Sequence, residues 1–193
     1  MAEPEVERRL AAILAADVVG YSRLMAADEE GTLARLRAFR AESIDPTIAK
    51  HHGRIVKLMG DGALVEFASV VDAVRCALDI QRGMTEHDPE LPDDQRIRLR
   101  IGVNLGDVII EGEDIYGDGV NIAARLEQIA SPGGICLSED AYRQVRGKLE
   151  IPIVDAGEQN LKNISNRVRV YRIEPSGAAA TADRPSSSIE SRR

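Results

Sequence analysis

The sequence predicts an α+β domain in which helices pack on one sheet, and three observations lead to that prediction. Apolar residues make up 44% and charged residues 30% of the 193-residue chain, proportions that are ordinary for a globular protein. Short strand-like segments alternate with segments of helical periodicity along most of the chain. The order of these segments, with a helix between strands and then a hairpin, favours helices layered on a sheet.

Local signals mark where the expected elements begin and end. Asp28 is a candidate N-cap for the first helix, Pro46 should kink or divide that helix, and Gly53 should end it. Gly60-Asp61-Gly62 is a hairpin turn signal, and Gly106 is expected at a second bend. In order, the expected elements are a strand at 10–18, a helix at 29–50, strands at 54–59 and 63–68, a helix at 69–84, strands at 96–105 and 107–111, a helix at 117–128, a strand at 135–138, a helix at 139–146, and strands near 151–155 and 167–173.

The chain is expected to form one domain over residues 8–174, between a short segment at 1–7 and a disordered tail or linker at 175–193. No apolar stretch approaches the roughly 20 residues that span a bilayer, and the acidic N-terminus is unlike a secretory signal. A formal net charge of −7 disfavours nonspecific nucleic-acid binding. Cys76 and Cys136 fall in apolar-periodic segments and are interpreted as buried thiols in a reducing cytoplasm.

Two aspartates, Asp17 and Asp61, each close a strand-like apolar segment. If the fold brings them together, their carboxylates make a hard oxygen site suited to Mg²⁺ or Mn²⁺. The alternative is that Asp17 caps a turn and Asp61 belongs to an ordinary Asp-Gly hairpin. Asn121 and Arg125 lie four residues apart on one expected helix and so share a face. Together with Lys57, these residue types suit chemistry on a nucleoside triphosphate.

Four motifs, in order and with compatible spacing, carry a family resemblance: Ala-Ala-Asp17-Val-Val-Gly-Tyr-Ser, Lys57-Leu-Met-Gly-Asp61-Gly, Arg100-Ile-Gly-Val-Asn-Leu-Gly106 and Asp114-Ile-Tyr-Gly-Asp-Gly-Val-Asn121-Ile-Ala-Ala-Arg125. Over residues 8–173 the chain resembles the catalytic domain of class III nucleotidyl cyclases, the adenylate and guanylate cyclase family, in the form common in rhizobia and related bacteria. The resemblance implies a ferredoxin-like βαββαβ core with additional C-terminal strands and a helix. It also implies a head-to-tail homodimer with active sites at the interface.

The resemblance assigns a role to each candidate residue. Asp17, Asp61 and the Val18 carbonyl would hold two Mg²⁺ or Mn²⁺ ions. The substrate would be contacted at its phosphates by Val19, Gly20, Tyr21, Ser22 and Lys162, at its base by Lys57 and Asp114, at its ribose by Asn121 and at its α-phosphate by Arg125. One departure is Asp107, which stands where some family members carry an arginine that contacts phosphate.

The implied reaction is conversion of ATP to 3′,5′-cyclic AMP and pyrophosphate, in which the ribose 3′-oxygen attacks the α-phosphorus. Lys57 can donate to adenine N1 and Asp114 can accept from the adenine amine, whereas guanine reverses both edges. The polarity of this pair therefore favours ATP. Two alternatives stay open: a guanylate or relaxed-specificity cyclase, and a catalytically silent domain that binds nucleotide and dimerises.

Overall fold

The structure is a computed structural model that describes residues 6–175, so the tail expected from the sequence lies, apart from Pro175, outside the described residues. Its strands are β1 (Glu7–Val18), β2 (Arg54–Met59), β3 (Gly62–Phe67), β4 (Leu99–Glu111), β5 (Asp114–Tyr116), β6 (Ile135–Ser138), β7 (Val154–Gln159) and β8 (Val168–Ile173). Its helices are α1 (Tyr21–Ala27), α2 (Glu29–Phe39), the π-helical segment η1 (Arg40–Ile44), α3 (Asp45–Lys50), α4 (Val70–Glu86), α5 (Asp118–Ile129) and α6 (Glu139–Val145).

One sheet joins all these strands in the order β2-β3-β1-β4-β6-β8-β7, with β5 paired to β4. Its first four strands form an antiparallel βαββαβ arrangement, because α1–α3 connect β1 to the β2–β3 hairpin and α4 connects β3 to β4. The ferredoxin-like core expected from the sequence is therefore confirmed. The added C-terminal strands continue the sheet through β6, which runs parallel to β4. The strand expected near 151–155 instead begins at Val154.

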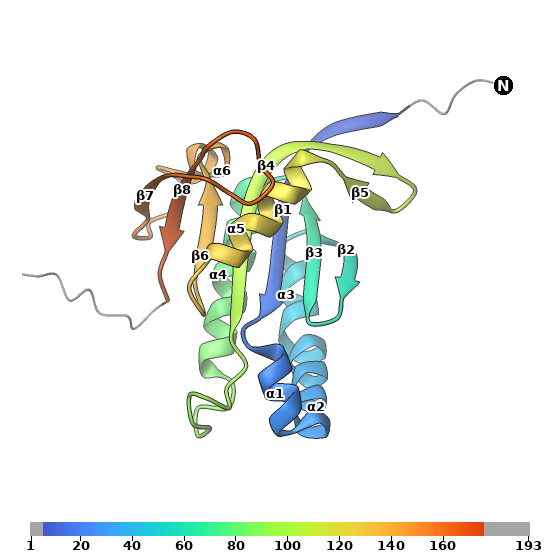
Figure 1. Ribbon diagram of the computed structural model, residues 1–193, viewed down its shortest axis with the longest axis vertical. Helices are drawn as coiled ribbons and strands as arrows, with labels where there is room; N and C mark the ends of the chain where they lie inside the picture. The colour runs from blue at the N-terminus through green and yellow to red at the C-terminus, as the bar shows by residue number, and fades with distance from the viewer. Residues whose placement is uncertain (1–5, 176–193) are drawn as a thin grey trace, which may run out of the picture.

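Helices cover both faces of the sheet (Figure 1), with α5 on one face and α3 and α4 on the other. Side chains of β1 alternate between these faces. Ala12 and Leu14 join the larger core beneath the helices that precede β4, while Ala11 and Ile13 join the core beneath α5. By the same alternation, Asp17 points to the α5 face of the sheet.

The first helical region follows its sequence signals closely. The Asp28 side chain caps α2 by accepting a backbone N–H, and Pro46 lies in the first turn of α3, directly after η1. The helix is thus divided, as predicted, by one π-helical segment. At the C-terminal end of α3, the residue that turns the chain is His52, at φ 62°, and not Gly53. Gly53 is needed for space, because a Cβ there would lie 2.7 Å from the Phe67 ring.

The expected pair of strands at 96–105 and 107–111, with a bend at Gly106, is wrong. β4 is one continuous strand because it pairs with β1 along nearly its whole length, and Gly106 stands opposite Ala11 within that ladder. A Cβ on Gly106 would lie 3.0 Å from the Gly119 Cα, so the glycine permits close packing of α5. The hairpin in this region lies after Gly106 and is formed by the end of β4 and by β5.

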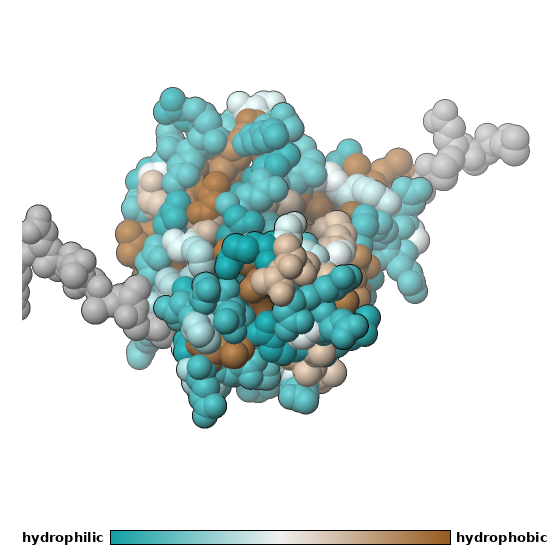
Figure 2. Space-filling view, turned by 60° about the horizontal axis from the view of Figure 1, so that its bottom comes forward, coloured by the Kyte–Doolittle hydropathy of each residue, from teal (hydrophilic) through white to brown (hydrophobic). Residues whose placement is uncertain are grey.

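Figure 2 shows the molecule with its α1–α2 end brought forward. The surface seen in this view is mostly hydrophilic, with separate hydrophobic areas. Within residues 6–175, no helix has both the length and the apolar character needed to cross a bilayer. Among the residues that the structure describes, six large hydrophobic side chains are nevertheless well exposed, and several flank the β2–β3 and β4–β5 hairpins. They are Val6, Leu10, Leu58, Met59, Tyr116 and Val154.

Candidate active site

The fold brings Asp17 and Asp61 to the same end of the sheet. Ala16 pairs with Ala63, so the β2–β3 turn lies directly beside Asp17. A Cβ built on Gly62 would be 3.8 Å from the Asp17 Cβ. The turn itself consists of Gly60 and Asp61, and Gly60 adopts φ 54°, a conformation that glycine reaches without strain. The carboxylates thus come from a central strand and a tight hairpin, both of which are rigid supports.

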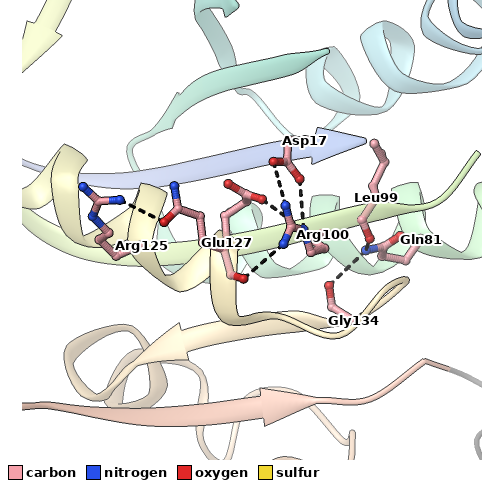
Figure 3. Close-up of polar contacts among 8 residues, drawn as sticks. Asp17, Gln81, Leu99, Arg100, Arg125, Glu127 and Gly134 are labelled. Atoms are coloured by element: carbon pink, nitrogen blue, oxygen red, sulfur yellow. Dashed lines mark hydrogen bonds and ion pairs between the residues drawn. The ribbon is translucent and has the colours of Figure 1, made fainter. Parts of the chain in front are cut away.

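Arg100 occupies the space beside Asp17 (Figure 3). Its Nε donates to Asp17 Oδ1 at 3.2 Å and its Nη2 donates to Asp17 Oδ2 at 3.0 Å, which is a bidentate pair. Its Nη1 donates to the Gln128 carbonyl at 3.1 Å, near the C-terminus of α5. A second carboxyl, from Glu127, lies with its Oε1 3.5 Å from Arg100 Nε. One guanidinium therefore lies between carboxyl groups of two different elements.

Glu127 is a buried acid, only 6% exposed. Burial foremost, and then the hydrogen bond and charge of Asp17 and the charge of Asp61, raise its pKa to about 9 against the opposing charge of Arg100. Its Oε1 has no hydrogen-bond partner within residues 6–175. Burial alone would lower the pKa of Arg100, but the hydrogen bonds and charge of Asp17, with the charges of Glu127 and Asp61, raise it. Arg100 thus stays positively charged beside these three acidic side chains.

The donor set at this end of the sheet fits divalent cations that arrive with a triphosphate. In the described part of the chain, no three His, Cys, Asp or Glu side chains form a preassembled metal centre. Asp17 and Asp61 supply carboxylates, and the Val18 carbonyl lies next to them in the chain. Mg²⁺ is commonly bound by one or two carboxylates and completed by substrate phosphates and water. The residues present therefore suit such an ion without forming a closed cage.

Lys57 and Asp114 come together although 57 positions separate them in the sequence. Lys57 Nζ, on β2, lies 3.3 Å from Asp114 Oδ2, on β5. The same ammonium is 5.7 Å from the centroid of the Tyr116 ring. The pKa of Asp114 is lowered, foremost by the hydrogen bond that its carboxylate accepts from the Ile115 backbone N–H. Its interactions with Tyr116 and Lys57 lower the pKa further. The pair thus presents a charged donor beside an ionised acceptor, and Lys57 remains 43% exposed.

Asn121 and Arg125 lie one turn apart on α5. Asn121 is exposed, and Arg125 Nη1 donates to Gln128 Oε1 at 2.9 Å. In Figure 3, Arg125 is directed away from Asp17. Lys162 is exposed on the turn that follows β7. Among the described residues, no hydrogen bond or ion pair joins any of these three to the other candidate site residues, so one protomer presents them as separate groups.

The expected phosphate segment is partly engaged within the protein. The Val19 N–H donates to the Arg98 carbonyl at 2.8 Å, so it is not free for phosphate. Gly20 adopts the left-handed conformation and begins α1 without a side-chain cap. The first N–H groups of a helix lack intrahelical acceptors, which leaves those of Tyr21 and Ser22 as donors, beside that of Gly20. An open pocket beside this segment is lined by Val19, Arg23, Asp93, Asp94, Arg96, Arg98 and Pro132.

Sequence reasoning missed the part that Arg100 and Glu127 play in this site. Arg100 is only the first residue of one motif, and Glu127 has no assigned role within the helix expected at 117–128. A signal was nevertheless present. A glutamate at an inward-facing helical position must find a partner or stay neutral, and that requirement points to a polar neighbour in the core.

This fold and this constellation define a nucleotidyl cyclase domain. Residues 6–175 match the family described as "Adenylate and Guanylate cyclase catalytic domain", and the chain belongs to that family.

Two curated relatives carry adenylate cyclase names. "Putative adenylate cyclase 3" of Rhizobium meliloti (strain 1021) is 48% identical over 179 residues, which cover 93% of this chain and 30% of that protein. "Adenylate cyclase" of Streptomyces coelicolor (strain ATCC BAA-471 / A3(2) / M145) is 36% identical over 143 residues, which cover 74% of this chain and 35% of that protein. The chain thus spans about a third of the length of these relatives.

Solved structures agree with the fold. The "Adenylate/Guanylate Cyclase/Hydrolase from Silicibacter pomeroyi" superposes with a TM-score of 0.83 at 47% identity, covering 89% of this chain and 99% of that one. "The adenylyl cyclase CyaB from P. aeruginosa" superposes with a TM-score of 0.78 at 22% identity, covering 89% of this chain and 97% of that one. At that lower identity the likeness concerns the fold alone.

Proposed function

We propose that this domain is an adenylate cyclase that converts ATP to 3′,5′-cyclic AMP and pyrophosphate. The observation that carries the proposal is the Lys57–Asp114 pair, whose charged atoms lie 3.3 Å apart on two neighbouring hairpins. The names of the two curated relatives support the same substrate. Both cysteines are buried free thiols, which suits a reducing cytoplasm, where ATP is abundant.

The base would be recognised by the polarity of that pair. An ammonium at Lys57 donates to adenine N1, and an ionised Asp114 accepts from the adenine amine. Guanine offers a donor at N1 and an acceptor at O6, so both contacts would be mismatched. Buried polar groups left without partners cost about 1–3 kcal/mol each, which is enough for strong discrimination. The low pKa of Asp114 keeps its acceptor form available at neutral pH.

Asp17, Asp61 and the Val18 carbonyl would hold two Mg²⁺ or Mn²⁺ ions. When bound, such ions activate the attacking ribose oxygen and neutralise the triphosphate. In this scheme Asn121 orients the ribose, and Arg125 stabilises the charge that develops on the α-phosphate. Preorganised donors of this kind act mainly on the transition state, because the charge they meet appears only as the reaction proceeds.

Both partners of a homodimer would contribute to each site. Tyr116 lies beside Lys57, and Met59 follows that lysine two residues along β2; both are exposed apolar side chains that a second copy can cover. Arg125 points away from Asp17 of its own chain, and Asn121 is exposed one turn before it on the same helix. We therefore assign Asp17 and Asp61 to one protomer. The Lys57–Asp114 pair, Asn121 and Arg125 would come from the other protomer.

The triphosphate would lie along the start of α1. Gly20, Tyr21 and Ser22 can offer backbone N–H groups to the phosphates. The Val19 N–H already donates to the Arg98 carbonyl, so Val19 would contact the phosphates without donating a backbone hydrogen bond. Lys162 is proposed as a contact to the terminal phosphates. Asp107 cannot replace the arginine of other family members, since its carboxylate is paired with Arg8 at 2.8 Å. The adjacent pocket holds Arg23, Arg96 and Arg98, of which Arg96 and Arg98 are paired with Asp93.

The test is to incubate the purified protein with ATP or with GTP, each with Mn²⁺, and to identify the cyclic product by mass spectrometry. We expect cyclic AMP and pyrophosphate from ATP, with much less cyclic GMP. Cyclic GMP as the main product would establish a guanylate cyclase, and comparable products would establish relaxed specificity. No cyclic product from either nucleotide, with nucleotide binding retained, would establish a silent domain.

A further inference from the structure

Arg100 binds the same carboxylate that the proposed function assigns to a divalent cation. Two of its nitrogens meet the two Asp17 oxygens at 3.2 and 3.0 Å. A fork of this kind uses the lone pairs that face the guanidinium, and a metal ion at Asp17 would compete with it for them. The guanidinium and the ion would also repel each other. A cation at Asp17 therefore requires a new arrangement for Arg100.

Glu127 offers that arrangement. The residue is 6% exposed, its Oε1 lacks a hydrogen-bond partner within residues 6–175, and that oxygen lies 3.5 Å from Arg100 Nε. Arg100 is meanwhile tied to α5 through the Gln128 carbonyl, which is next to Glu127 in the chain. A small rotation of the guanidinium about this tie can exchange one carboxylate for the other. Figure 3 shows both carboxyl groups beside the same guanidinium.

We propose that Arg100 is a resident counter-ion for Asp17, and that it passes to Glu127 when a divalent cation takes the Asp17 carboxylate. Arg100 and Glu127 are thus positioning residues that set the affinity of the site for metal. This inference rests on the proposed function, because it requires metal at Asp17. It also accounts for an acid at a helical position that is otherwise apolar, where an unpartnered carboxyl is costly.

The experiment measures Mn²⁺ binding to the full chain, from the electron paramagnetic resonance signal of free Mn²⁺. Saturating 3′-deoxy-ATP is present, because it lacks the attacking hydroxyl and prevents turnover. Arg100→Gln removes the competing cation and should tighten Mn²⁺ binding. Glu127→Gln removes the second carboxyl acceptor and should weaken it by roughly 10–100-fold, the range found for groups that act through a metal ligand. The double variant should return toward the wild-type affinity.

Matched controls come from a second arginine–glutamate pair on the same sheet. Glu66 is also buried, at 8% exposure, and pairs with Arg9. Arg9→Gln and Glu66→Gln should leave Mn²⁺ affinity unchanged. Circular dichroism should show that each variant is folded. Arg100→Gln and Glu127→Gln test the proposal independently, so one of them suffices if the other does not fold.

The outcomes separate this inference from the proposed function. If Asp17→Asn and the wild type bind Mn²⁺ equally, the metal assignment itself is wrong. If Asp17→Asn loses Mn²⁺ while Arg100→Gln and Glu127→Gln bind as the wild type does, only the transfer of Arg100 is refuted. Weaker binding by Arg100→Gln would also overturn it, because Arg100 would then simply hold Asp17 in place.

Discussion

The close approach of α5 to β4 depends on Gly102, and an alanine there should displace the helix. A Cβ on Gly102 would lie 2.5 Å from the Ala123 carbonyl oxygen and 2.9 Å from Leu126 Cβ, and it would also collide with the Glu127 backbone nitrogen. Two of these three atoms belong to the helix backbone, so no side-chain rotation relieves the clash. The helix must move away from the sheet.

The size of the effect follows from these distances. Restoring an ordinary separation of about 3.5 Å requires a shift of roughly 1 Å, and a gap of that size forfeits a quarter to a half of each contact energy along the interface. Ala123 and Leu126 are fully buried there. Overpacking costs typically 1–3 kcal/mol, so with the lost contacts we expect Gly102→Ala to lower the free energy of unfolding by about 3 kcal/mol.

Urea unfolding followed by circular dichroism at 222 nm measures this loss. Gly83→Ala is the matched control, because it lies within α4 and its Cβ would meet only the Ser43 Oγ, at 2.9 Å, which can rotate away. Alanine is favoured over glycine in a helix by up to about 1 kcal/mol, so Gly83→Ala should be neutral or stabilising. If Gly102→Ala unfolds within about 0.5 kcal/mol of the wild type, the close approach does not constrain α5 and the reasoning fails.

Three further predictions concern the site and its surroundings. Mixing inactive Asp17→Ala with inactive Arg125→Ala should restore about a quarter of wild-type cyclase activity, because half of the dimers are mixed and each of these has one intact site; no recovery despite proven subunit exchange would exclude a shared site. Lys57→Glu with Asp114→Cys should shift the ratio of kcat/KM for ATP over GTP by about 10²–10³-fold toward GTP, and an unchanged ratio would show that the pair does not read the base. Burial alone would raise the pKa of Asp79, but its hydrogen bond and charge interaction with His51, directly after α3, lower it below 3.8. The stability that Asp79 adds is thus present above pH 4 and lost below it, so the difference in melting temperature between wild type and Asp79→Asn should shrink as the pH falls from about 6 to 2, and a constant difference would contradict this linkage.

The sequence predicted the elements well wherever local signals decide them. The cap at Asp28, the division of the helix near Pro46 and the two-residue turn at Gly60 are all local and all confirmed. The bend at Gly106 was wrong because a glycine within a strand can serve tertiary packing, and only the pairing with β1 reveals it. The candidate side chains were found by motif, whereas the Arg100–Glu127 contact required knowledge of how α5 crosses β4.

The two sides of α5 serve different sites in the proposed dimer, and this gives a last prediction. Glu127 lies beside Arg100, which pairs with Asp17 of the same chain, whereas Arg125 points away from Asp17 and is assigned to the partner's site only in the proposed dimer. A shift of α5 in Gly102→Ala should therefore disturb metal binding in one site and α-phosphate stabilisation in the other.

Mixed dimers can separate these effects if the inactive partner is in large excess, so that few Gly102→Ala homodimers form and each mixed dimer has only one working site. Paired with Asp17→Ala, the Gly102→Ala chain must supply the carboxylates, so the mixture should need more Mn²⁺ for half-maximal activity. Paired with Arg125→Ala, it must supply Arg125, so turnover should fall at saturating Mn²⁺ while the Mn²⁺ requirement stays that of the mixture of Asp17→Ala and Arg125→Ala. Identical Mn²⁺ requirements in both pairings would show that α5 does not link the two sites, since the same displaced helix would then have acted on only one of them.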